Sequence, residues 1–153
     1  MNTSNITNYK PKDFAELLDA GLQSGCEYYY YNFRRRIFKM VRKANIVQKQ
    51  ELGGGKGCAE VHEIVPEKDL YGHGKLYAKV VLKPNSSVGW HRHVGETEPY
   101  YILEGEGIFV DDDGSRTKVG PGDVCTILPG QCHAIENASS CKDLAFMALI
   151  HKD

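Results

Sequence analysis

Short apolar runs recur through the last two thirds of the chain. They last four to eight residues and are separated by turns rich in glycine, proline, asparagine and aspartate. Runs of this length are typical of strands, and their close spacing favours an all-β barrel or sandwich. The pattern predicts strands over residues 76–83, 100–103, 107–110, 123–128 and 144–150.

The first part of the chain follows a helical period instead. Apolar residues recur at helical spacing on either side of a turn at residues 21–25: Phe14, Leu17 and Leu18 before it, and Tyr30, Phe33, Ile37 and Val41 after it. Pro11 stands where a first helical residue is favoured. The run Tyr28–Tyr31 also suits a strand, because aromatic residues favour strands. We therefore predict a helical extension over residues 1–45 and a β domain over residues 46–153.

A glycine cluster, residues 53–57, separates the two parts. Its Gly-Lys pair resembles part of a phosphate-binding loop, but Lys56 is followed by Gly57 rather than by Ser or Thr, and β-like sequence follows where a helix is needed. The cluster is therefore interpreted as a flexible connector.

The length and the distribution of charge divide the chain at the same place. At 153 residues it has the size of one domain, and its formal net charge of −1 is a cancellation. Residues 1–50 carry nine basic and four acidic residues, net +5, so residues 51–153 carry ten and sixteen, net −6. The basic residues 34–43 could contact nucleic acid or an anionic membrane surface, but docking on the acidic body of the same or a neighbouring chain is favoured. Nucleic acid is not an expected partner.

The sequence offers no route into or across a membrane. Its longest apolar run, Leu144–Ile150, is far shorter than the roughly 20 residues of a spanning helix, and residues 1–9 lack the apolar core of a secretory signal. We expect a cytoplasmic protein. The five cysteines lack any C-x-x-C spacing, so we expect reduced, mostly buried thiols: Cys26, Cys58, Cys125, Cys132 and Cys141.

The chemistry is concentrated in two short segments. His91 and His93 are two residues apart, and on a strand such residues project from one face. Glu98 follows after a short loop, and His133 can add a fourth donor from the second segment. Three imidazoles and one carboxylate suit one divalent transition metal ion, Mn, Fe, Ni, Zn or Cu, and leave positions open on a five- or six-coordinate ion.

These segments resemble the two motifs of the cupins. The first motif, G-x5-H-x-H-x(3,4)-E-x6-G, matches at four positions, and the second, G-x5-P-x-G-x2-H-x3-N, also matches at four. The matching residues are His91, His93, Glu98 and Gly105, then Gly122, Gly130, His133 and Asn137. Asn85 replaces the leading glycine of the first motif, and Leu128 replaces the proline of the second. Both departures concern turn residues rather than ligands.

The resemblance covers about residues 40–153 and implies a cupin double-stranded β-helix, or jelly-roll barrel, with a metal inside. It implies that His91, His93, Glu98 and His133 are the ligands, and that residues 1–39 are an addition to the family's core. Since cupins usually pair through barrel edges and exposed strand edges need cover, we also expect a homodimer.

The residues around the ligands give further expectations. Glu96 is the rival carboxylate, but the spacing to Gly105 favours Glu98 and places Glu96 in a loop. Tyr100 and Ile102 continue the inward face of Glu98. Tyr100 is the candidate for proton transfer, although a structural role in the barrel lining is somewhat favoured, and Ile102 is the candidate for lining a substrate site. Trp90 and Cys132 should face away from the metal.

The leading functional hypothesis is a metalloenzyme acting on a small oxygen-bearing molecule: a carboxylate, a hydroxy-ketone or a sugar acid. A cupin that binds or senses a small ligand without turnover is the first alternative. The set His-x-His, Glu-x-Tyr and His also resembles that of cupin lyases acting on dimethylsulfoniopropionate, in which Tyr100 would be the base. The reaction type stays open between lyase, isomerase and dioxygenase.

Overall fold

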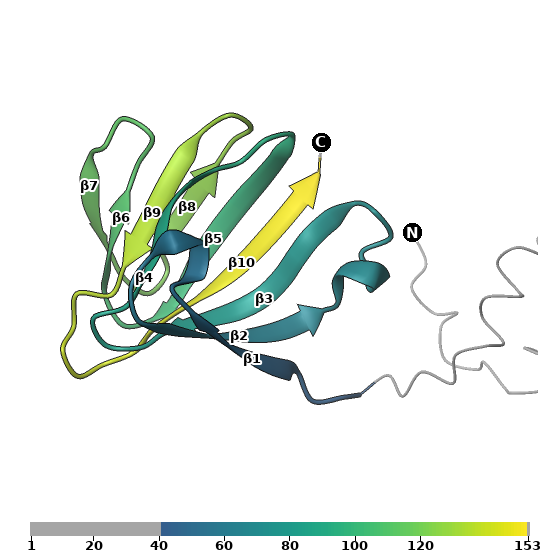
Figure 1. Ribbon diagram of the computed structural model, residues 1–153, viewed down its shortest axis with the longest axis horizontal. Coiled ribbons are helices and arrows are strands. Elements are labelled where there is room, and N and C mark those ends of the chain that lie inside the picture. Colours follow the sequence, from purple (N-terminus) through teal and green to yellow (C-terminus); the bar gives the residue numbers. More distant parts are fainter. Residues whose placement is uncertain (1–40, 153) are drawn as a thin grey trace, which may run out of the picture. The chain divides into compact units, whose positions relative to one another are not determined.

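Ten strands arranged in two antiparallel sheets make up the fold (Figure 1). The computed structural model describes residues 41–152, and those from Lys43 onward form one compact unit. One sheet has the strand order β1-β2-β3-β10-β5-β8 and the other the order β4-β9-β6-β7. The strands are β1 (Asn45–Gln50), β2 (Cys58–Val65), β3 (Gly74–Leu82), β4 (Ser87–Arg92), β5 (Glu96–Glu104), β6 (Gly107–Val110), β7 (Arg116–Val119), β8 (Val124–Ile127), β9 (Cys132–Glu136) and β10 (Leu144–Lys152).

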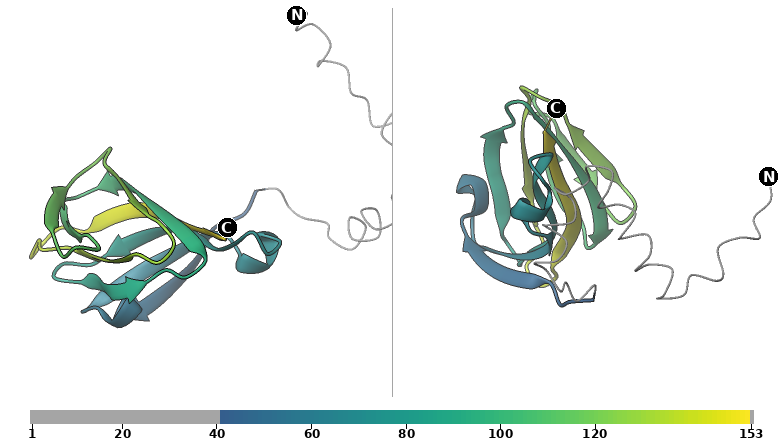
Figure 2. Two further views of the ribbon diagram at one scale, coloured as in Figure 1. Left: turned by 90° about the horizontal axis from the view of Figure 1, so that it is seen from above. Right: turned by 90° about the vertical axis from the view of Figure 1, so that its right-hand side faces the viewer.

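The two sheets face each other around one apolar core (Figure 2). The alternation is clear on β5, where Glu96, Glu98, Tyr100 and Ile102 are buried and point inward. Strands of both sheets contribute side chains to the core, among them Leu82, Ile102, Phe109, Ile135 and Phe146. The predicted all-β jelly roll is therefore confirmed.

All five predicted strands are present, as β3, β5, β6, β8 and β10. The other five strands lack a clear apolar alternation. All six residues of β1 are exposed, β7 is mostly polar, and β4 and β9 carry histidines on their inner face. The predicted helical extension over residues 1–45 lies almost wholly outside the described residues, and β1 already begins at Asn45. In the part of the chain that the structure describes, no helix is long and apolar enough to cross a membrane.

The glycine cluster is a tightly packed turn, which corrects the prediction of a flexible connector. It begins with the 3-10 turn η1 (Leu52–Gly54), whose Gly53 has a φ of 61°. This turn packs against β4, where a Cβ on Gly89 would lie 2.4 Å from the Gly53 carbonyl oxygen. A Cβ on Gly55 would lie 2.2 Å from the Ser87 carbonyl oxygen. The glycines are required because two backbones touch here.

Asn85, which replaces the motif glycine, adopts a left-handed φ of 58°. Asparagine is one of the few residues that enter this region readily, so the substitution keeps the turn. Leu128, which replaces the motif proline, is exposed and lies in the turn before β9. Both departures are thus accommodated in turns, as the sequence predicts.

Asn137 fastens the end of β9 to the loops around it. Its side-chain Nδ2 donates to the carbonyl oxygens of Leu82, Lys83 and Lys142 at 3.0, 3.1 and 2.8 Å. Its Oδ1 accepts from the Ser139 N–H at 3.1 Å, and the side chain is buried. The motif asparagine therefore has a structural role: it holds three backbone segments together.

Replacing Asn137 by alanine should lower the free energy of unfolding by about 2–3 kcal/mol, because buried carbonyl groups would lose their donor. Urea unfolding followed by circular dichroism measures the change. The matched control is N45A on the exposed edge strand β1, which should stay within about 0.5 kcal/mol of the parent protein. Equal stability of the two variants would contradict this role for Asn137.

Candidate metal centre

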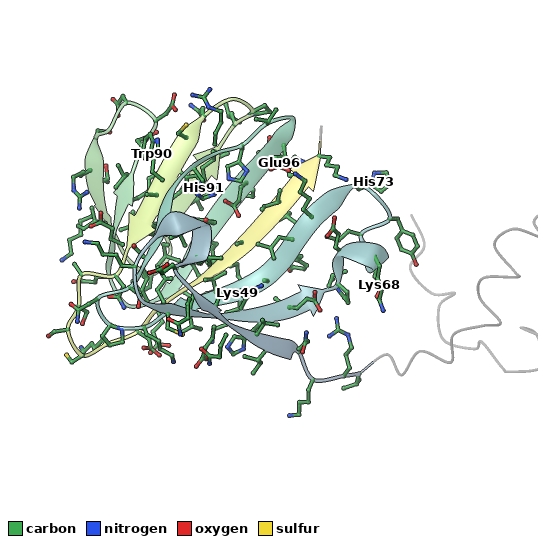
Figure 3. The ribbon with its side chains drawn as sticks, viewed as in Figure 1. Lys49, Lys68, His73, Trp90, His91 and Glu96 are labelled. Carbon is green, nitrogen blue, oxygen red and sulfur yellow. The ribbon has the colours of Figure 1, made fainter. Side chains whose placement is uncertain are left out.

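Three strand segments bring the four predicted donors together inside the barrel. His91 lies on β4, directly across from His133 on the paired strand β9. His93 follows the end of β4, and Glu98 comes from β5 of the other sheet. His93, Glu98 and His133 are almost completely buried, whereas His91 is partly exposed and lies between the sheets (Figure 3).

The donor atoms converge on one point. The Nε2 atom of His93 lies 3.1 Å from the Nε2 atoms of both His91 and His133, and 3.1 Å from Oε2 of Glu98. His133 Nε2 lies 3.2 Å from the same Glu98 oxygen. One ligand atom from each of the four residues falls within 4.8 Å of every other.

Hydrogen bonds among these four side chains do not explain the arrangement. His93 Nε2 carries at most one hydrogen but faces three acceptors, and the buried Glu98 Oε2 has no contact with hydrogen-bond geometry. Two ligands at right angles around one ion, each about 2.1 Å from it, stand about 3.0 Å apart. The observed separations are close to that value, so the four residues fit a divalent transition metal ion.

Neighbouring groups help to fix the ligand atoms. The His91 Nδ1–H donates to the carbonyl oxygen of Gly89 at 2.8 Å, which leaves the lone pair of Nε2 free to bind a metal. On the far side of the His93 ring, Nδ1 faces the Glu96 carboxylate at 3.4 Å. Glu96 opens β5 and is buried, so its predicted place in a loop is wrong.

The electrostatics differ among the buried members of the cluster. Burial would raise the pKa of Glu98, but the close contacts with His133 and His93 outweigh burial and lower it. The contact with Glu98 raises the pKa of His93, whereas burial lowers the pKa of His133. Glu98 is thus held ionised and His133 neutral, which are the ligand forms that bind metals, whereas Glu98 favours a protonated His93 that an ion would have to displace.

Tyr100 forms the next part of the inward face of β5. Its ring lies 5.3 Å from that of His133 and 4.4 Å from that of Phe146, measured between centroids. Burial, together with the negative charge of the nearby Glu98, raises the pKa of its hydroxyl well above the usual value. The phenol therefore stays protonated and touches a predicted ligand.

A cavity of about 130 Å³ opens beside the cluster. Its polar lining consists of His91, Glu98 and Tyr100. The rest of the lining is apolar or glycine: Leu52, Gly53, Leu76, Val80, Val88, Phe146, Ala148 and Ile150. Leu52 and Gly53 belong to η1, so the turn at the glycine cluster forms one wall of this cavity. No signal in the sequence indicates this role.

Other predicted residues lie elsewhere. Ile102 is fully buried in the apolar core and is not among the residues that line the cavity. Trp90 is half exposed, as expected for a side chain that faces away from the metal centre. Cys125 and Cys132 are buried as predicted, but Cys58 is only partly buried and Cys141 is exposed, which corrects the expectation for Cys141. Cys26 lies outside the described residues.

Comparison with known proteins agrees with the fold. A family model described as the cupin domain matches residues 78–149. The chain is 40% identical over 113 residues to an oxalate-binding protein of Thermotoga maritima, which covers 72% of this chain and 92% of that protein.

Two solved structures illustrate the range of similarity. A crystal structure described as a predicted oxalate decarboxylase of Thermotoga maritima has 38% identity and a TM-score of 0.69, over 74% of this chain and 99% of that one. The polyketide cyclase RemF of Streptomyces resistomycificus shares the fold at 20% identity, with a TM-score of 0.59 over 76% and 80% of the two chains. The chain belongs to the cupin family.

Proposed function

We propose that the protein binds one divalent transition metal ion through His91, His93, Glu98 and His133, and that the loaded site binds a small chelating dicarboxylate, oxalate being the first to test. The composition of the cavity carries this proposal. Apart from the ligands and Tyr100, its wall offers apolar side chains and glycine. The bound ion would supply the positive charge and Lewis acidity that attract a carboxylate.

The wall argues against the larger candidates that the sequence left open. A sugar acid carries several hydroxyl groups, each of which would lose water on entering an apolar cavity. Unpaired buried polar groups cost about 1–3 kcal/mol each, and Tyr100 could satisfy few of them. A compact dicarboxylate presents its oxygens to the ion instead, and it suits a cavity of about 130 Å³. The oxalate-binding relative supports the same ligand class.

A metalloenzyme is the second candidate, and Tyr100 favours it. Besides the ligands, the Tyr100 hydroxyl is the one proton donor on the described cavity wall. Decarboxylation of oxalate breaks the carbon–carbon bond, releases carbon dioxide and adds a proton to give formate, so it requires such a donor. Oxalate recovered unchanged after incubation with the metal-loaded protein assigns it to binding, and formate production assigns it to catalysis.

Three further expectations are also proposals: a homodimer, a cytoplasmic location, and a division of the chain into an extension over residues 1–45 and a barrel over residues 46–153. The edge strand β1 supports the homodimer, because β1 ends the six-stranded sheet, its residues are exposed, and its outer edge pairs with no other described strand. Such an edge needs cover, and a second copy of the chain supplies it. Analytical ultracentrifugation would show the mass of a dimer.

Removing one ligand should abolish tight metal binding. H133A should weaken the affinity for Zn²⁺ or Mn²⁺ more than about 100-fold, since losing even an outer hydrogen bond to a ligand commonly costs about 10- to 100-fold. Chelator competition measures the affinity. H151A, which alters an exposed histidine at the end of β10, is the control and should bind as the parent does. Unchanged affinity in H133A would contradict the ligand assignment.

Oxalate binding should require the metal. Calorimetric titration of the metal-loaded protein should give a saturable signal with oxalate and a much weaker one with gluconate, whose hydroxyl groups the cavity cannot satisfy. The chelator-treated protein should give none with either compound. Equal oxalate binding with and without metal, or tighter binding of gluconate, would contradict the proposal.

Leu52 should limit the length of the ligand, because its side chain closes one wall of the cavity. L52A should raise the affinity for malonate relative to oxalate by about tenfold, or about 1.4 kcal/mol. Calorimetry with both compounds measures the ratio, and L128A, at an exposed leucine outside the cavity, is the control. A ratio that is the same in L52A and L128A would exclude Leu52 from this role.

A further inference from the structure

A second buried carboxylate lies beside the metal centre and is not one of its four donors. Glu96 stands two residues before Glu98 on β5, so both side chains point into the barrel. The side chain of Glu96 has only 10% of its surface exposed. Burying a carboxylate without a partner is costly, so its partners indicate what it does.

The two carboxylates lie on opposite sides of one imidazole ring. Glu98 faces Nε2 of His93 at 3.1 Å, on the side where the other donors converge. Glu96 faces Nδ1 of the same ring at 3.4 Å. Because the two ring nitrogens point in different directions, Glu96 cannot join the point at which the Nε2 atoms meet. This geometry distinguishes the role of Glu96 from that of a ligand.

The far side of His93 has no other partner for its ring N–H. Within the described residues, His93 Nδ1 is buried and makes no hydrogen bond. The contact with Glu96 is slightly longer than a formed hydrogen bond, which spans about 2.7–3.2 Å. When Nε2 binds an ion, Nδ1 must carry the hydrogen, and in metal sites a carboxylate, a backbone carbonyl or a water usually accepts it.

Lys75 holds Glu96 in this position. Its Nζ atom lies 2.6 Å from Oε2 of Glu96, while Oε1 faces His93. Lys75 comes from β3, and β3 and β5 flank β10 on either side, so the ion pair reaches across one strand. The lysine side chain is half exposed, at 49%, and keeps its charged end near solvent while it neutralises the buried carboxylate.

We propose that Glu96 is a positioning residue for the metal centre: held by Lys75, it accepts the Nδ1–H of His93 and fixes that ring with Nε2 toward the ion. This inference rests on the proposed metal site and assigns a role to two residues outside it. Glu96 acts by orienting a ligand and by making it a better donor. Lys75 acts one step further out, by fixing the carboxylate.

The test measures metal affinity and the state of the His93 ring in the full-length protein. E96Q removes the charge but keeps the shape, and it should weaken Zn²⁺ binding about 10- to 100-fold in chelator competition. K75M should weaken it less, because Glu96 remains. The controls alter an exposed glutamate on the same strand β5, E104Q, and a second lysine on the same strand β3, K79M; both should bind Zn²⁺ as the parent does.

Nuclear magnetic resonance separates positioning from a general loss of stability. In the Zn²⁺-loaded parent protein, the Nδ1–H proton of His93 should resonate far downfield because it is hydrogen-bonded to a carboxylate. In E96Q this signal should move upfield, while urea unfolding of the metal-free protein serves as the control for folding.

The outcomes separate the two proposals. A parent protein that binds no Zn²⁺ overturns the metal centre and the role of Glu96 with it. If E96Q binds Zn²⁺ as tightly as the parent does and the His93 signal does not move, the role of Glu96 is overturned but the metal centre is not. If E96Q loses Zn²⁺ affinity only because it is less stably folded, and the His93 Nδ1–H signal does not move, the positioning role is overturned as well.

Discussion

Four donor atoms from two sheets meet at one point inside an apolar barrel, and most features of the fold hold them there. His93, Glu98 and His133 are almost fully buried, and their side chains lie 3.1–3.2 Å from one another. Such a cluster is unfavourable without a cation, because the lone pairs of buried nitrogens and oxygens face each other without enough hydrogens between them. A shared metal ion would resolve this conflict and would explain why an otherwise apolar core contains these residues.

The surrounding structure sets the position of each donor. The register of β4 on β9 places His91 opposite His133, and the inward face of β5 supplies Glu98 and Tyr100. Asn137 fixes the loops at the end of β9 through three carbonyl groups. The turn η1 packs its glycines against β4, and so brings Leu52 to the wall of the cavity.

Strand spacing was sufficient to place His91 and His93 on one face, whereas the full set of four donors and the jelly roll followed from the resemblance of the two motifs to those of the cupins. The strands that lack apolar alternation were harder to find. The sequence of β1 is exposed on both faces, and β4 and β9 carry inward histidines that interrupt any apolar pattern. Periodicity reports burial in an apolar environment, so it misses strands whose inner face holds a polar site.

Contacts between segments distant in sequence could not be predicted in this way. The glycines of η1 are explained only by the backbone of β4, which lies against them in space. The place of Glu96 depends on Lys75, a residue on another strand of the same sheet, and no spacing rule connects the two. Ile102 follows the inward period of β5, yet the cavity ends before it.

Anomalous diffraction at the absorption edge of the metal, from a crystal of the metal-loaded protein, shows whether His91, His93, Glu98 and His133 bind one ion together. We expect one strong peak per chain, in direct contact with the three Nε2 atoms and the Glu98 carboxylate. A peak elsewhere, or a structure of the loaded protein with these four side chains bound only to each other or to water, would contradict the metal centre.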